Sequence, residues 1–88
     1  MNEKKLQAMI MLEFIKATKK FDRFNSMHEG YAVVKEEVEE MWDEIKKNNR
    51  SNAILEAVQV GAMALRFLYD AMDAKTWEIL LHKYEIKE

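Results

Sequence analysis

The chain has 88 residues, of which 49% are hydrophobic and 34% are charged, and its formal net charge at pH 7 is −2. A chain of this length forms one small domain, here residues 1–88. It buries only about 60% of the surface that its unfolded form exposes, so assembly into a homo-oligomer is expected. The nearly balanced charge excludes a nucleic-acid-binding protein that depends on bulk positive charge. The absence of cysteine excludes disulfides and thiolate metal sites.

The most apolar stretch covers residues 53–69, and Glu56, Gln59 and Arg66 interrupt it. It is too short and too polar for a membrane span, so no membrane partner is expected. The N-terminus does not resemble a signal sequence, which makes a cytoplasmic location the expectation. The chain has no proline and only two glycines, and it is rich in Ala, Leu, Met, Glu and Lys. These features predict an all-α fold, a small bundle of about four helices.

The first predicted helix covers residues 3–24. Its apolar residues recur at spacings of three and four, the period of a buried helical stripe. The stripe consists of Leu6, Ile10, Phe14, Ala17, Phe21 and Phe24. The same helix carries a basic side, made of Lys16, Lys19, Lys20 and Arg23. This side is either a solvated face, favoured by the negative end of the helix dipole, or a source of contacts to substrate phosphates.

The second predicted helix covers residues 27–48. Ser26, followed three residues later by Glu29, has the form of a capping box at its start. His28 then lies in the first turn, either as an ordinary polar residue or as a catalytic base. An apolar seam of the same helix consists of Tyr31, Val34, Val38, Met41 and Ile45. A separate acidic ridge consists of Glu37, Glu40 and Glu44, at least a quarter-turn from that seam.

A short polar connector, residues 46–52, makes the second and third helices antiparallel neighbours. The third helix is predicted over residues 52–69, with Ser51 or Asn52 as its cap. Gly61 in its middle indicates that another helix approaches closely. A last helix is predicted over residues 74–84. Asp73 would cap it, and Trp77, Leu80, Leu81 and Tyr84 would point inward.

The third helix has few polar side chains, and three of them, Glu56, Gln59 and Arg66, share one narrow stripe. Buried charges persist only when they are paired, hydrogen-bonded or bound to a metal ion. The acidic ridge of the second helix is the nearest polar surface that these three side chains could face. If the two helices pack antiparallel, the carboxylates of Glu37, Glu40 and Glu56 and the amide oxygen of Gln59 converge. Such a set of oxygen ligands suits Mg²⁺. The alternative is that Arg66 or lysines of the first helix neutralise the acids.

The motif Glu36-Glu37-x-x-Glu40, followed after fifteen residues by Glu56-x-x-Gln59, resembles that of the MazG-like all-α nucleoside triphosphate pyrophosphohydrolases. The family pattern is Glu-Glu-x-x-Glu and then Glu-x-x-Asp, on two consecutive helices. The resemblance covers roughly residues 20–70. It implies that Glu37, Glu40, Glu56 and Gln59 bind Mg²⁺. It implies that Glu36, the candidate catalytic residue, either supports the metal ligands without binding the metal or helps to activate water.

The resemblance also implies hydrolysis of nucleoside triphosphates to monophosphate and pyrophosphate by a dimer or tetramer. Two features depart from the family. Gln59 stands where relatives have aspartate, and the last helix lacks their basic phosphate-binding pattern. The candidate substrate contacts are therefore Lys16, Lys20, Arg23, His28 and Arg66. The alternative function is a non-catalytic helical oligomer, a degenerate family member that acts as an interaction module.

Overall fold

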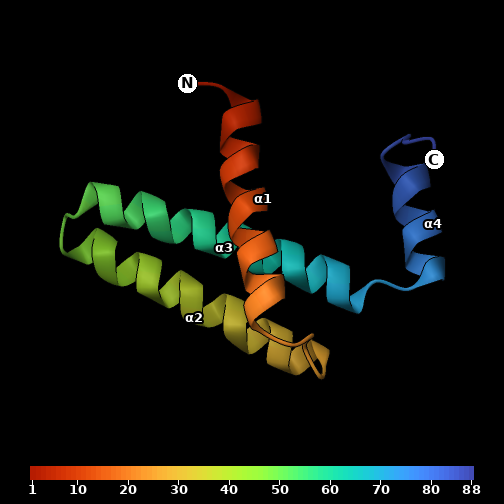
Figure 1. The fold of residues 1–88 in the computed structure, drawn as a ribbon, viewed down its shortest axis with the longest axis horizontal. Coiled ribbons are helices and arrows are strands. Elements are labelled where there is room, and N and C mark those ends of the chain that lie inside the picture. Colours follow the sequence, from red (N-terminus) through yellow and green to blue (C-terminus); the bar gives the residue numbers. More distant parts are fainter.

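The computed structural model describes all 88 residues as four α-helices without a strand (Figure 1), which confirms the all-α prediction. The helices are α1 (Glu3–Lys20), α2 (Met27–Lys46), α3 (Arg50–Ala71) and α4 (Ala74–Lys83). None of them combines the length and the apolar character that crossing a membrane requires.

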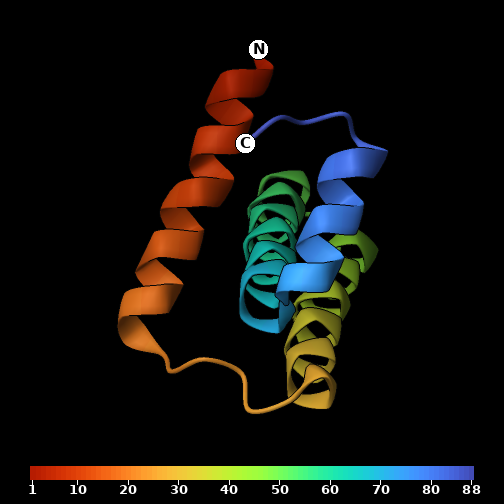
Figure 2. The ribbon, with the colours of Figure 1, turned by 90° about the vertical axis from the view of Figure 1, so that its right-hand side faces the viewer.

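The helices α2 and α3 lie side by side as an antiparallel hairpin, as predicted, and α1 crosses this hairpin on the α3 side (Figures 1 and 2). The fourth helix packs against none of the other three. The bundle is therefore a three-helix assembly with α4 standing apart. The radius of gyration is 14.6 Å, whereas a compact chain of this length has about 12 Å.

The core lies where α1 crosses the hairpin. Ala17 of α1 and Ala62 and Met63 of α3 are buried, and four half-buried side chains pack against them. These are Ile10, Phe14, Val33 and Val34. A Cβ added to Gly61 would lie 3.0 Å from Ile10 Cδ1, so the close approach predicted from this glycine is confirmed. A second close approach, at Gly30, joins α2 to the Phe67 ring of α3, 2.7 Å from the position of an added Cβ.

Side-chain caps start each helix. Ser26 Oγ accepts a hydrogen bond from the Glu29 N–H, and Asp73 caps α4 through the Thr76 N–H, as the sequence predicts. The predicted cap of α3 was wrong. Asn49, and not Ser51 or Asn52, accepts from the Asn52 N–H, because the preceding Asn48 turns the chain with a positive φ of 58°.

Three helices end earlier in the sequence than predicted, and the difference is largest for α1. The helix ends at Lys20, and Phe21 is already extended with a φ of −123°. The backbone of the connector that follows, residues 21–25, is held by side chains of α3. Arg66 Nη2 donates to the Asp22 carbonyl (2.6 Å), and Asp70 Oδ2 accepts from the Phe24 N–H (3.0 Å). These bonds replace the helical ones that the periodic pattern predicted. The other two, α2 and α4, end at Lys46 and Lys83.

Many large apolar side chains stay exposed in the single chain. On α2 the predicted seam is only partly covered, since Tyr31 and Val38 are 64% and 44% exposed. The side chains expected to point inward from α4 are not buried either, and Trp77 and Tyr84 are 40% and 62% exposed. All four predicted side chains line a groove that α4 forms with α3, and Leu80 and Leu81 are half-buried, so the predicted face is correct but is incompletely covered in the single chain.

Candidate metal centre and adjoining groove

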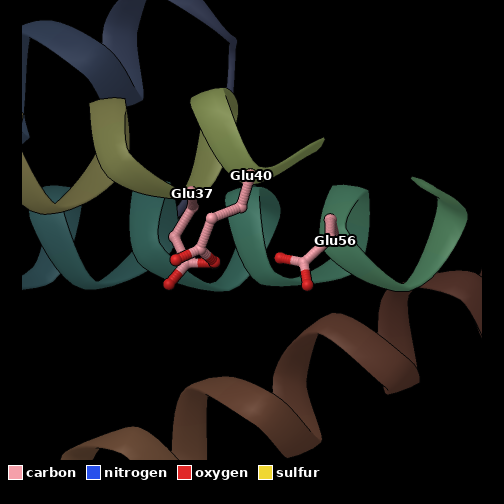
Figure 3. Close-up of side chains that lie close together, drawn as sticks. All are labelled: Glu37, Glu40 and Glu56. Carbon is pink, nitrogen blue, oxygen red and sulfur yellow. The ribbon is translucent and has the colours of Figure 1, made fainter. Parts of the chain in front are cut away.

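The helices α2 and α3 bring three carboxylates together. Glu37 and Glu40 lie one turn apart on α2, and Glu56 projects toward them from α3 (Figure 3). One side-chain oxygen of each lies within 4.8 Å of those of the other two. We call these three residues the acidic cluster. Three oxygens at this spacing match the ligand arrangement of a hard divalent cation.

No basic side chain of this chain neutralises the acidic cluster. None of the six ion pairs in the structure includes an acid of this cluster: their acids are Glu13, Glu39, Asp43, Glu44 and, in two pairs, Asp70. The alternative in which Arg66 or lysines of α1 pair with these carboxylates is thus not what the structure shows. Glu56 Oε2 is also buried without a hydrogen-bond donor. A buried carboxylate oxygen without a donor is costly, and a bound cation would remove that cost.

The electrostatics of the acidic cluster disfavour three negative charges. Burial, followed by the nearby charges of Glu40 and Glu56, raises the pKa of Glu37 to about 7. Burial, followed by the charge of Glu40, also raises the pKa of Glu56. Like charges at short range each disfavour ionisation of the other, and a bound cation reverses the effect. The three carboxylates therefore fit the ligand set of a divalent cation.

A groove of about 720 Å³ adjoins the acidic cluster between α1, the connector 21–25 and the hairpin. Glu36 and Glu37 line it from α2, and Gln59, Met63 and Arg66 line it from α3. The basic residues Lys16, Lys20 and Arg23, together with Phe21, Phe24 and Asn25, line the opposite wall. The volume lies within the range of small-molecule sites, and basic and acidic groups face each other across it.

Gln59 is turned toward α1. Its Nε2 donates a hydrogen bond to Glu13 Oε2 (3.0 Å), so its amide oxygen is the atom that can act as a ligand. This bond, with smaller contributions from Lys16, lowers the pKa of Glu13. Glu13 was missed by the sequence reasoning. It lies on the same side of α1 as Lys16 and Lys20, three and seven residues before them, so the spacing that selected those lysines also points to it.

Arg66 has partners other than the acidic ridge that the sequence suggested. It is 4% exposed, lies 3.8 Å from Asp70 Oδ2 and donates to the Asp22 carbonyl. Its guanidinium also lies 4.5 Å from the centre of the Phe24 ring. Arg66 thus fixes one wall of the groove, and its buried Nε has no hydrogen-bond partner. Asp70, which sequence reasoning did not select, shares this task.

The residues predicted from the sequence fall into three groups. Glu37, Glu40 and Glu56 form the acidic cluster. The residues Lys16, Lys20, Arg23, Glu36, Gln59 and Arg66 line the adjoining groove, as does Glu37. His28 is exposed in the first turn of α2 and does not line the groove. The structure therefore brings together all the predicted site residues except His28.

Comparison of this chain with known protein families, with curated proteins and with solved structures gives no match.

Proposed function

We propose that this chain is a cytoplasmic, magnesium-dependent nucleoside triphosphate pyrophosphohydrolase that works as a homo-oligomer. The observation that carries the proposal is the acidic cluster: three carboxylates of two helices meet within 4.8 Å, and no lysine or arginine pairs with them. The motif that resembles the MazG-like family supplies the reaction type. The groove beside the cluster supplies a place for the substrate.

The residues of the chain have distinct tasks in this reaction. Glu37, Glu40 and Glu56 would hold Mg²⁺, with the amide oxygen of Gln59 as a weaker fourth ligand. Bound Mg²⁺ supplies neutralisation of the charge that develops on the phosphates. Glu36, exposed on the wall of the groove, would accept a proton from the attacking water.

The basic wall of the groove would bind the phosphate chain. Lys20 and Arg23 line it, and neither the Lys20 ammonium nor the Arg23 guanidinium is buried. Lys16 also lines the groove and pairs loosely with Glu13, at 3.4 Å. An exposed pair at this distance is weak, so Lys16 can exchange this partner for a phosphate oxygen at little cost. Hydrolysis between the α- and β-phosphates then releases pyrophosphate and a nucleoside monophosphate.

A non-catalytic helical oligomer is the second candidate. Two observations favour it: Gln59 contributes no charge to the acidic cluster, and Arg66 is occupied by Asp22 and Asp70. In this case no nucleotide phosphate would bind in the groove. The chain would then act through its exposed apolar surface alone.

A pyrophosphate-release assay separates the two candidates. The purified chain is incubated with Mg²⁺ and a panel of nucleoside and deoxynucleoside triphosphates. We expect turnover with at least one of them, its loss in Glu40→Gln and its retention in Glu39→Gln. Glu39 is the matched control because it is exposed, pairs with Lys35 and lies outside the cluster. No turnover with any nucleotide, together with no Mg²⁺-induced rise in Tm, would favour the non-catalytic oligomer.

A further inference from the structure

A second groove, of about 690 Å³, lies between the C-terminal half of α3 and α4. It shares no lining residue with the groove beside the acidic cluster. Nine of its ten lining residues are hydrophobic, among them Leu68, Tyr69, Trp77, Leu80 and Leu81. The charged one, Glu88, accepts a hydrogen bond from the Trp77 indole (2.9 Å). The groove is therefore apolar except for this one carboxylate.

The helix α4 lacks the packing that a short helix needs. It has only ten residues, and isolated helices shorter than about 12–15 residues are marginal in water. Tertiary contacts usually make up the difference, yet α4 packs against no other helix of its chain, and Figure 1 shows it apart from the hairpin. The contacts that α4 makes within the chain therefore leave much of its apolar face open.

The accessible surface area of the chain shows how much surface is available for a partner to cover. The chain exposes 7474 Å², whereas a folded monomer of its mass exposes about 5,400 Å². The excess of about 2,000 Å² per chain is more than a standard interface buries on one partner, about 800 Å², and falls in the range of obligate homodimers. A second copy of the chain accounts for an excess of this size.

We infer that a second copy of this chain covers the groove between α3 and α4 in a two-fold symmetric dimer. In such a dimer the same surface faces itself, so one contact covers the α4 of both protomers. The apolar seam of α2 is also exposed, but α2 already packs along α3 and does not need a partner to stay helical. The inference gives a surface to the proposed self-association, and it does not depend on nucleotide hydrolysis.

Sedimentation velocity of the full chain over a range of concentrations tests this dimer. We compare wild type with Leu80→Asp, which puts a charge into the groove. Ile79→Asp puts the same charge on the neighbouring residue, which is 56% exposed and does not line the groove. We expect wild type and Ile79→Asp to be dimers. In Leu80→Asp the Kd of the dimer should rise by about 100-fold or more, because the carboxylate would be buried unpaired. A monomeric wild type, or a Leu80→Asp dimer as tight as wild type, overturns the inference.

Tryptophan emission tests the same surface without a charged substitution. In a Trp42→Phe chain the remaining tryptophan is Trp77, which lines the groove. We expect its emission to shift to the red as dilution separates the protomers. Emission that stays constant while sedimentation reports dissociation would show that the dimer uses another face, and would overturn the inference. Neither measurement uses nucleotide or Mg²⁺. Both results can therefore be interpreted even if the chain does not hydrolyse nucleotides.

Discussion

Glu37, Glu40 and Glu56 are forced into one volume by the packing of α2 on α3, and without a cation they repel one another. The raised pKa of Glu37, to about 7, is a direct consequence of burial and of the neighbouring carboxylates. A folded-state pKa above the ordinary value of 4.5 means that the native state binds this proton more tightly than the unfolded state does. Stability is therefore lost as the pH rises from about 4.5 to about 7.

This repulsion predicts a pH-dependent Tm in the presence of a chelator. Wild type should melt at a higher temperature at pH 5 than at pH 8. Glu37→Gln should remove much of this difference and stabilise the chain at pH 8 by on the order of 1 kcal/mol, a value that allows for solvent screening. Thermal melts of the two chains measure it, with Glu39→Gln as a control outside the cluster. An unchanged pH dependence in Glu37→Gln would mean that the three acids do not interact.

The convergence of these acids followed from the sequence because it needs only two local facts. Residues three apart share a helix face, and a short connector makes neighbouring helices antiparallel. The contact of Gln59 with Glu13 joins residues 46 positions apart and depends on how α1 crosses α3. That crossing is set by the close approach at Gly61, whose existence the sequence indicated but whose direction it did not. The contact between Glu13 and Gln59 could therefore be found only in the structure.

The connector 21–25 shows how tertiary contacts decide where a helix ends. Phe21 and Phe24 continue the apolar period of α1, so the pattern alone extends the helix through them. The chain leaves the helix because Arg66 and Asp70, more than 40 residues away, bind the connector's backbone. The periodicity of a sequence contains no record of such distant partners. The ends of helices are consequently less predictable than their existence.

Asp70 is the main anchor of this connector, and its removal should be costly. The side chain of Asp70 is 6% exposed, accepts from the Phe24 N–H and lies beside the buried Arg66. Asp70→Ala leaves that guanidinium without a carboxylate, so we expect a loss of about 3 kcal/mol in the free energy of unfolding. Asp43→Ala, which breaks an exposed pair with Lys46, should cost less than about 0.5 kcal/mol. Urea denaturation compares them, and equal losses would contradict the anchoring role.

At the scale of the whole molecule, the chain exposes more surface than its mass requires. Only five of its 88 residues are buried, and exposed large apolar side chains occur on all four helices. The sequence indicated this excess, because α1 and α3 carry more apolar residues than one partner surface needs. The sequence did not indicate that α4 would stand apart from the other helices. An amphipathic pattern shows which face of a helix is apolar, but it does not show which surface covers that face.

Self-association predicts that the Tm depends on protein concentration. If folding and dimerisation are coupled, about 100-fold dilution reduces the stability of the dimer by about 2.7 kcal/mol. For two chains of 88 residues this corresponds to a fall in Tm of roughly 7 °C. Calorimetric scans at several concentrations measure the fall. A Tm independent of concentration would show that the single chain is stable by itself.

The most direct test of the account is a calorimetric titration of Mg²⁺ into the chain without nucleotide. The acidic cluster predicts one saturable site per chain in wild type and in Glu39→Gln, and loss of that site in Glu56→Gln, which removes the carboxylate contributed by α3. Absence of saturable binding in wild type, or the same binding in Glu56→Gln, would contradict the claim that carboxylates of two helices share one cation.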